Sequence, residues 1–238
     1  MKKTSSILLL CIVLVGVFSV LTYLNPVNNS GDINEKKEQE QDDREYEYIV
    51  VVDAGHGGID PGKIGVNGIY EMDINLAISY KVSEILDKED VKVIMTRKDD
   101  NGLYKDSDTN KKMADMTSRI DIINKSKADL VVSIHQNSFT SSEARGAQVF
   151  YYKESAKGEQ LAECIQKKLR LMDETNTRDK KNDGDYYILK KSNPPAVIVE
   201  CGFLSNEEEM KLLSTDAYQE KVAKAIASGI KEYLKSNE

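Results

Sequence analysis

The chain of 238 residues contains no tryptophan, three cysteines and only two histidines. So few cysteines exclude a disulfide framework, and we expect Cys164 and Cys201 to be separate buried thiols. The chain also lacks an excess of basic residues. Its net charge is −7, which argues against nucleic acid as the main partner. Its length allows one well-buried domain with additional segments.

Long apolar runs are absent except at the N-terminus, where two lysines precede the uncharged residues 4–24. Such a run is costly to leave in water, so residues 1–24 are typical of an export signal or a membrane anchor. We favour the anchor, because the run approaches the ~20 residues that span a bilayer and no small-x-small cleavage site follows. We therefore expect an exported protein, at the outer face of the cytoplasmic membrane or secreted.

Aliphatic residues are nearly absent from residues 25–47, which are polar and carry mixed charges. This composition is typical of a solvated linker. The folded domain is therefore expected to comprise residues 48–238.

Apolar runs and helical periodicities alternate along this domain. The expected strands are 48–52, 91–96, 130–134, 146–152, 187–190 and 196–199, and the expected helices are 71–86, 113–123, 161–172 and 222–234. Polar loops are expected at 97–112 and 173–185. The alternation predicts a single α/β domain with a mostly parallel, twisted sheet flanked by helices. Sites in such sheets form at the carboxyl ends of the strands.

A glycine-rich loop follows the first expected strand. Gly57, Gly62 and Lys63 match a phosphate-binding loop as far as its last position, where Ile64 replaces the Ser or Thr that would bind magnesium. Further glycines follow, so no helix begins at Lys63 to face a phosphate. We therefore reject a nucleotide site.

The two histidines each follow an apolar strand, His56 after 48–52 and His135 after 130–134. Hydrolytic zinc sites commonly take two histidines and one carboxylate and leave one position for water. Glu71, at the start of the next helix, is the natural third ligand, although a first-turn glutamate is also favoured by the helix dipole. Glu200 directly follows a buried strand, where a carboxylate is costly unless it is paired or functional. It could serve as a general base.

Four blocks, in order, resemble the zinc-dependent N-acetylmuramoyl-L-alanine amidases of the amidase-3 type: DAGHGGIDPG, GIYEMDINLAIS, SRIDIINKSKADLVVSIHQNS and PAVIVECGFLSN. They cover nearly all of residues 48–234. The resemblance implies the family's phosphorylase/hydrolase-like fold. It also implies Zn²⁺ ligands at His56, Glu71 and His135, and a catalytic glutamate at Glu200.

The resemblance further implies a peptidoglycan substrate, cleaved at the amide bond between N-acetylmuramic acid and L-alanine. Zinc can polarise such a carbonyl and make water nucleophilic, while Glu200 would take the proton and return it to the leaving amine. The short build with an N-terminal apolar segment is similar to the germination-specific members of spore-forming bacteria. This similarity implies a role in spore cortex maturation, through muramic-lactam formation. No wall-binding repeats are present, so recruitment would come from the anchor or from an activating protein partner.

Three further residues have two interpretations each. Asp53 could accept a hydrogen bond from His56 or could be a strand-end turn residue. Arg119 and Asn137 could contact the substrate or support the site. Alternatively, they are a surface helix charge and a loop cap.

Three other functions are compatible with parts of the pattern: a non-catalytic, metal-stabilised wall-binding module, an autolysin of the vegetative wall, and a cysteine hydrolase that uses Cys201. A binding module would not need Glu200. Adjacent strand residues point to opposite faces, so only one of Glu200 and Cys201 can face the metal. A thiol tolerates burial on the other face better than a carboxylate does.

Gln136 departs from the small residue that many family members carry at this position.

Overall fold

The computed structural model describes residues 45–65 and 68–237. The predicted export segment and most of the predicted linker lie outside these residues, so both stay predictions. Within the described part of the chain, no helix combines the length and the apolar character that a membrane span requires.

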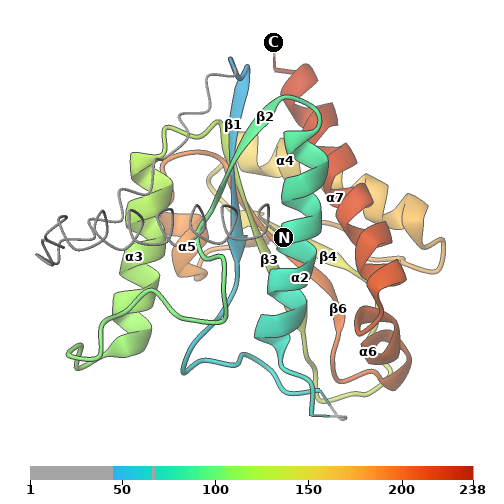
Figure 1. Ribbon diagram of the computed structural model, residues 1–238. Coiled ribbons are helices and arrows are strands. Elements are labelled where there is room, and N and C mark those ends of the chain that lie inside the picture. The colour runs from blue at the N-terminus through green and yellow to red at the C-terminus, as the bar shows by residue number, and fades with distance from the viewer. Residues whose placement is uncertain (1–44, 66–67, 238) are drawn as a thin grey trace, which may run out of the picture. The chain divides into compact units, whose positions relative to one another are not determined.

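A six-stranded sheet forms the centre of the fold, in the order β2-β1-β3-β6-β4-β5 (Figure 1). Its strands are β1 (Tyr48–Ala54), β2 (Val91–Met95), β3 (Leu130–Asn137), β4 (Gln148–Tyr152), β5 (Lys181–Asp183) and β6 (Ala196–Phe203). The pairs β1–β2, β1–β3, β3–β6 and β4–β5 are parallel, and only β4–β6 is antiparallel. The predicted α/β fold with a mostly parallel sheet is confirmed.

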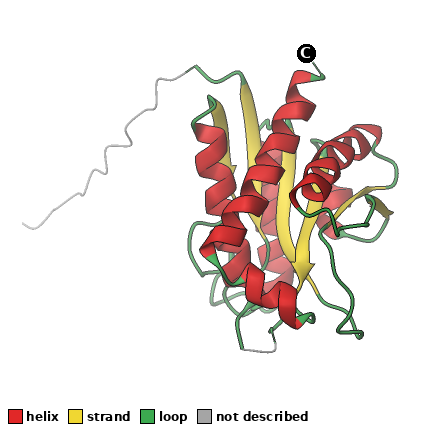
Figure 2. Cartoon of the chain, turned by 90° about the vertical axis from the view of Figure 1, so that its right-hand side faces the viewer, coloured by secondary structure: helices red, strands yellow, loops and turns green. Residues whose placement is uncertain are grey.

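Helices cover both faces of this sheet. The larger hydrophobic cluster joins the sheet to α2 (Glu71–Asp87), α4 (Ala156–Met172), α6 (Glu207–Leu213) and α7 (Asp216–Lys235). The smaller cluster joins the opposite face to α3 (Lys111–Lys125) and α5 (Tyr187–Lys191). We call the side of the sheet that packs against α2, α4, α6 and α7 the α2 face, and the opposite side the α3 face. Helices α2 and α7 run along the strands (Figures 1 and 2).

The local sequence explains why these elements form where they do. On α2, Ile74, Ile78, Val82 and Leu86 recur every four residues and are fully or almost fully buried against the sheet. Helix α3 begins at a capping residue, because Asn110 accepts a hydrogen bond from the backbone N–H of Met113 at 3.1 Å. The central strands β3 and β6 are buried on both faces, as parallel strands between helical layers require.

One predicted element is wrong: residues 187–190 form part of helix α5 and not a strand. Ile188 and Leu189 are both buried in the α3-face cluster, and adjacent residues of a strand would point to opposite faces. Periodicity alone cannot separate a strand from a helix in so short an apolar run.

Other boundaries also differ from the predictions. Strand β3 continues past the predicted end at residue 134, so His135 lies within the strand. The predicted 173–185 loop contains the short edge strand β5, and α7 begins at Asp216 and not at residue 222. Helix α6 was not predicted. This helix begins soon after the end of β6, where Asn206 is its capping residue.

Candidate active site

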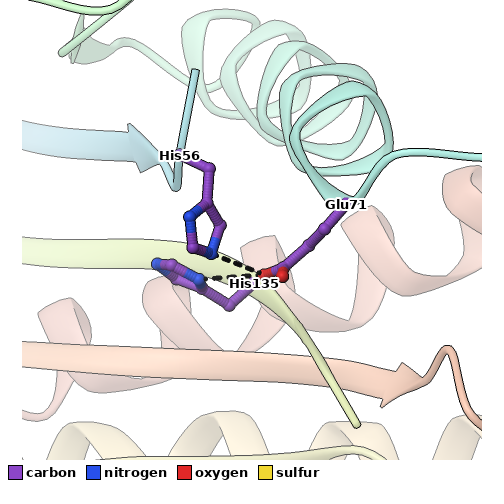
Figure 3. Close-up of side chains that lie close together, drawn as sticks. All are labelled: His56, Glu71 and His135. Carbon is purple, nitrogen blue, oxygen red and sulfur yellow. Dashed lines mark hydrogen bonds and ion pairs between the residues drawn. The ribbon is translucent and has the colours of Figure 1, made fainter. Parts of the chain in front are cut away.

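Two histidines and one glutamate converge at the carboxyl ends of β1 and β3 (Figure 3). His56 follows β1, Glu71 is the first residue of α2, and His135 lies in β3. His56 Nε2 and His135 Nδ1 lie 3.2 and 3.1 Å from the same oxygen, Oε1 of Glu71. The ligand atoms of all three residues lie within 4.8 Å of one another. One metal ion could therefore contact all three.

The charges in this cluster favour a cation. Burial alone would raise the pKa of Glu71, but hydrogen bonds from His135 and His56 hold it well below its usual range. Burial alone would lower the pKa of His135, but the hydrogen bond and charge of Glu71 raise it. An ionised carboxylate between two imidazoles is a donor set that suits zinc.

His56 is presented by an unusual turn. Its φ of 62° lies in the left-handed region, which is uncommon for a residue other than glycine. The guanidinium of Arg119 donates to the carbonyls of Ala54, at 2.7 Å, and of His56. The guanidinium of Arg97 donates to the carbonyls of Ala54 and Gly55 at 2.9 and 3.0 Å. Two buried arginines thus hold the strained turn through hydrogen bonds to its carbonyl groups.

Gly55 allows the His135 ring to approach this turn. A Cβ atom on Gly55 would lie 2.3 Å from both Cε1 and Nε2 of His135, far inside van der Waals contact. Gly62 is similarly confined, because a Cβ there would lie 2.5 Å from Oε2 of Glu71. At these two positions the glycine-rich loop makes room for the proposed metal ligands and forms no phosphate cradle.

Asp60 orients the ring of His56. Its Oδ2 lies 3.2 Å from Nδ1 of His56 and 3.3 Å from Nζ of Lys112. A carboxylate at Nδ1 fixes the tautomer that leaves Nε2 free for a metal. From the sequence, Asp53 was one candidate for this role, whereas Asp60, only four residues beyond His56 in the same loop, was not predicted.

Asp53 instead accepts hydrogen bonds from other side chains. Arg119 Nη1 lies 2.7 Å from its Oδ1, Thr96 Oγ1 lies 2.6 Å from the same oxygen, and Ser133 Oγ lies 2.5 Å from Oδ2. The interpretation of Arg119 as a surface charge is wrong, because its side chain is 2% exposed. Asn137 lies at the end of β3, where its Oδ1 accepts from the backbone N–H of Ser138 at 2.8 Å, as a loop cap does.

We expect the buried pair Asp53–Arg119 to make folding sensitive to acid. Burial would raise the pKa of Asp53, but the charge of Arg119 and two hydroxyl hydrogen bonds lower it from 3.8 to about 2. A depressed carboxyl pKa stabilises the fold above the unfolded value, here by about 2 kcal/mol, and this contribution is lost as the pH falls towards 2. Asp53→Asn should therefore reduce the free energy of unfolding near pH 6, and the difference from wild type should shrink to about half by pH 3.

Urea unfolding at several pH values tests this expectation. Asp121→Asn is the matched control, because its pair with Lys125 on the same helix is exposed and contributes little. A difference between Asp53→Asn and wild type that stays constant from pH 6 to pH 3 would contradict the assignment.

Glu200 lies beside the cluster of His56, Glu71 and His135. It pairs in register with His135 across the parallel strands β3 and β6, is 7% exposed, and its Oε2 has no hydrogen-bond partner among the described residues. Burial raises the pKa of Glu200 to about 7, with His135 lowering it and Glu71 raising it. A carboxyl group with this pKa can exchange a proton near neutral pH, as a general base must.

Cys201 belongs to the opposite face of the sheet. It is buried in the α2-face cluster with Val197 and Val199, whereas Ile198 faces α3. By strand alternation, Glu200 shares the α3 face with Ile198. Burial also raises the pKa of the Cys201 thiol, which disfavours the reactive thiolate. Cys164 and Cys201 are both free, although Cys164 is only partly buried.

A cavity of about 230 Å³ adjoins the two histidines on the α3 face. It lies between the loop after β1, helix α3 and helix α5. Both histidines line it, together with Tyr104, Met116 and Tyr186. Burial, followed by the charge of Glu200, raises the pKa of Tyr186 to about 12, so this tyrosine stays protonated at neutral pH. The cavity offers an apolar, aromatic-lined space to a group whose reacting atom lies at the histidines.

Comparisons with known proteins agree on one family. The family model described as N-acetylmuramoyl-L-alanine amidase matches residues 50–232. The chain is 38% identical to the germination-specific N-acetylmuramoyl-L-alanine amidase of Bacillus subtilis, over 78% of this chain and 79% of that protein. It is 30% identical to the N-acetylmuramoyl-L-alanine amidase AmiA of Escherichia coli, over 78% of this chain and 76% of the relative.

A solved structure is also similar. The CwlD amidase from Clostridioides difficile, in complex with the GerS lipoprotein, is 45% identical to this chain with a TM-score of 0.77. The similarity covers 79% of this chain and 99% of that one. At this identity the resemblance extends to sequence as well as fold.

Proposed function

Because the chain belongs to the N-acetylmuramoyl-L-alanine amidase family, we propose that it hydrolyses the amide bond between N-acetylmuramic acid and L-alanine in peptidoglycan. The observation that carries this proposal is the cluster of His56, Glu71 and His135 with the buried carboxyl of Glu200 beside it. A binding module would have no use for that carboxyl, whose Oε2 lacks a partner within the described chain.

The residues of the cluster fit Zn²⁺. Two imidazole nitrogens and one carboxylate oxygen are the donors of many hydrolytic zinc sites. We assign the contacts to His56 Nε2, Glu71 Oε1 and His135 Nδ1, which already face one another. When bound, the ion supplies Lewis-acid chemistry that polarises the scissile carbonyl and favours ionisation of water.

The protein's own groups transfer the proton, bind the substrate and position the ligands. Glu200 takes a proton from the attacking water and delivers it to the amine of L-alanine as the amide bond breaks. The cavity beside the histidines holds the substrate and keeps bulk water away. Asp60 fixes the His56 ring, and Arg119 fixes the turn that carries it. The assignment of Glu200 rests on its burial, its raised pKa and its pairing with His135.

We assign the activity to the spore cortex, where release of the peptide stem permits muramic-lactam formation before germination. The germination-specific name of the B. subtilis relative supports this assignment. The solved complex of the CwlD amidase with the GerS lipoprotein supports a protein partner, to which we assign an activating role. Export with attachment to the membrane through residues 1–24 is part of the same proposal and rests on the N-terminal sequence.

Product analysis tests this function. The full-length chain, supplied with zinc, is incubated with isolated cortex peptidoglycan and with vegetative peptidoglycan, and the products are identified by mass spectrometry. We expect peptides with a new N-terminal L-alanine and unbroken glycan strands, with cortex as the better substrate. Cleavage within the glycan or within the peptide stem would contradict the proposed activity. A preference for vegetative wall would point to an autolysin.

A further inference from the structure

Asn75, a fully buried residue of α2, touches all three chain segments that carry the proposed metal ligands. Its Nδ2 donates to the carbonyl of Gly55 at 3.1 Å and to Oε1 of Glu71 at 3.4 Å. Its Oδ1 accepts from Nε2 of Gln136 at 3.2 Å. Gly55 immediately precedes His56, and Gln136 immediately follows His135. One amide therefore connects the β1 loop, α2 and β3 behind the ligands.

The segments around this amide are also tied to one another. The backbone N–H of Gln136 donates to Oε1 of Glu71 at 3.0 Å, so Glu71 is held by β3 as well as by its own helix. Arg97 Nη2 donates to the carbonyls of Gly55 and Met72 at 3.0 and 2.8 Å, which joins the β1 loop to the first turn of α2. Asn75 is the member of this network that reaches all three segments without itself being a proposed metal ligand.

We propose that Asn75 is a positioning residue that holds the three ligands in register before metal arrives and thereby sets the affinity for zinc. The inference rests on the zinc site of the proposed function. A ligand set already placed by the protein loses less conformational freedom when it binds the ion, so its affinity is higher. Supporting residues that orient metal ligands typically account for a 10–100-fold difference in metal affinity.

Gln136 provides a second test of the proposal, with a smaller expected effect on zinc affinity. Its side chain contributes only the third of the three hydrogen bonds of Asn75. Gln136→Met keeps the volume and leaves the hydrogen bonds of Asn75 to Gly55 and Glu71 intact. We therefore expect a smaller loss of zinc affinity for Gln136→Met than for Asn75→Ala.

Zinc affinity of the full-length protein tests the proposal. The dissociation constant is measured by competition with a chromophoric chelator, and the stability of the metal-free protein is measured by urea unfolding. We expect Asn75→Ala to bind zinc 10–100-fold more weakly than wild type. If Asn75→Ala does not fold, Asn75→Leu fills nearly the same volume without a donor and takes its place.

Gln166→Ala is the matched control. Gln166, on α4, is another buried amide with three hydrogen bonds, and these go to the backbone of Ala147, Val149 and Arg178 and to no segment that carries a proposed ligand. Both variants should lose stability, but only Asn75→Ala should lose zinc affinity. Equal zinc affinity of Asn75→Ala and wild type would overturn the positioning role. Failure of the wild type to bind zinc at all would instead overturn the zinc site itself, and the inference with it.

Discussion

Glu200→Gln should retain zinc and the native fold while losing roughly 10²-fold or more in turnover, the usual scale for a general base. The amide has the shape of the carboxyl group but cannot take a proton from water. We do not expect a loss of stability, because Oε2 of Glu200 is buried with no hydrogen-bond partner in the described part of the chain. Turnover on peptidoglycan, zinc content and urea unfolding measured on one preparation check all three expectations.

Cys201→Ser is the matched control for this variant. Cys201 is the next residue of β6 but lies on the α2 face, away from the histidines. The substitution should leave activity intact with a modest loss of stability, since it places a hydroxyl in an apolar environment. An inactive Cys201→Ser together with an active Glu200→Gln would overturn the mechanism and favour a cysteine hydrolase.

His135→Ala should lose zinc and activity together. Its Nδ1 is one of the three atoms that converge, and two remaining ligands bind zinc poorly. The loss of affinity should exceed the ~100-fold that removal of a supporting residue causes. Zinc bound after equilibration at a buffered free concentration, followed by turnover on the same sample, measures both effects.

Asn137→Ala provides the comparison for His135→Ala. Asn137 lies two residues further along β3, and its Oδ1 accepts a hydrogen bond from the backbone N–H of Ser138. This variant should bind zinc as wild type does. Full zinc binding and full turnover in His135→Ala would show that the ligands are elsewhere.

The sequence was sufficient to bring the proposed ligands together. Strands that alternate with helices predict a parallel sheet, and residues that follow parallel strands lie at the same edge of that sheet. His56, Glu71 and His135 do meet at this edge. The opposite orientations of Glu200 and Cys201 also follow from the two-residue period of a strand. Both predictions depend on the regular geometry of strands, which the local sequence pattern is enough to indicate.

The supporting residues could not be identified in this way. Asn75 reads as an ordinary polar residue of an amphipathic helix, and Arg97 as the first residue of a polar loop. Their roles depend on carbonyl groups about 20 and 42 residues away in sequence, which only the folded chain brings near. Asp53 was a candidate to support His56 because it adjoins the loop, but its Oδ1 accepts a hydrogen bond from the guanidinium of Arg119.

Strand β4 was predicted but its antiparallel direction was not, and helix α5 was wrongly predicted as a strand, for related reasons. The residues of β4 have the apolar character of the parallel strands, and its direction depends on how the chain returns to pair with β6. Helix α5 consists of only five residues, too few to show a period. Its position matters because Tyr186 and Tyr187 line the cavity beside the histidines.

Anomalous X-ray scattering at the zinc edge, from crystals of the zinc-loaded protein, tests the central claim most directly. We expect one strong peak in the domain, about 2.0–2.2 Å from His56 Nε2, Glu71 Oε1 and His135 Nδ1, with the carboxyl of Glu200 facing its open side. A peak bound by other residues, or zinc that contacts Glu200 in place of Glu71, would contradict the proposed site.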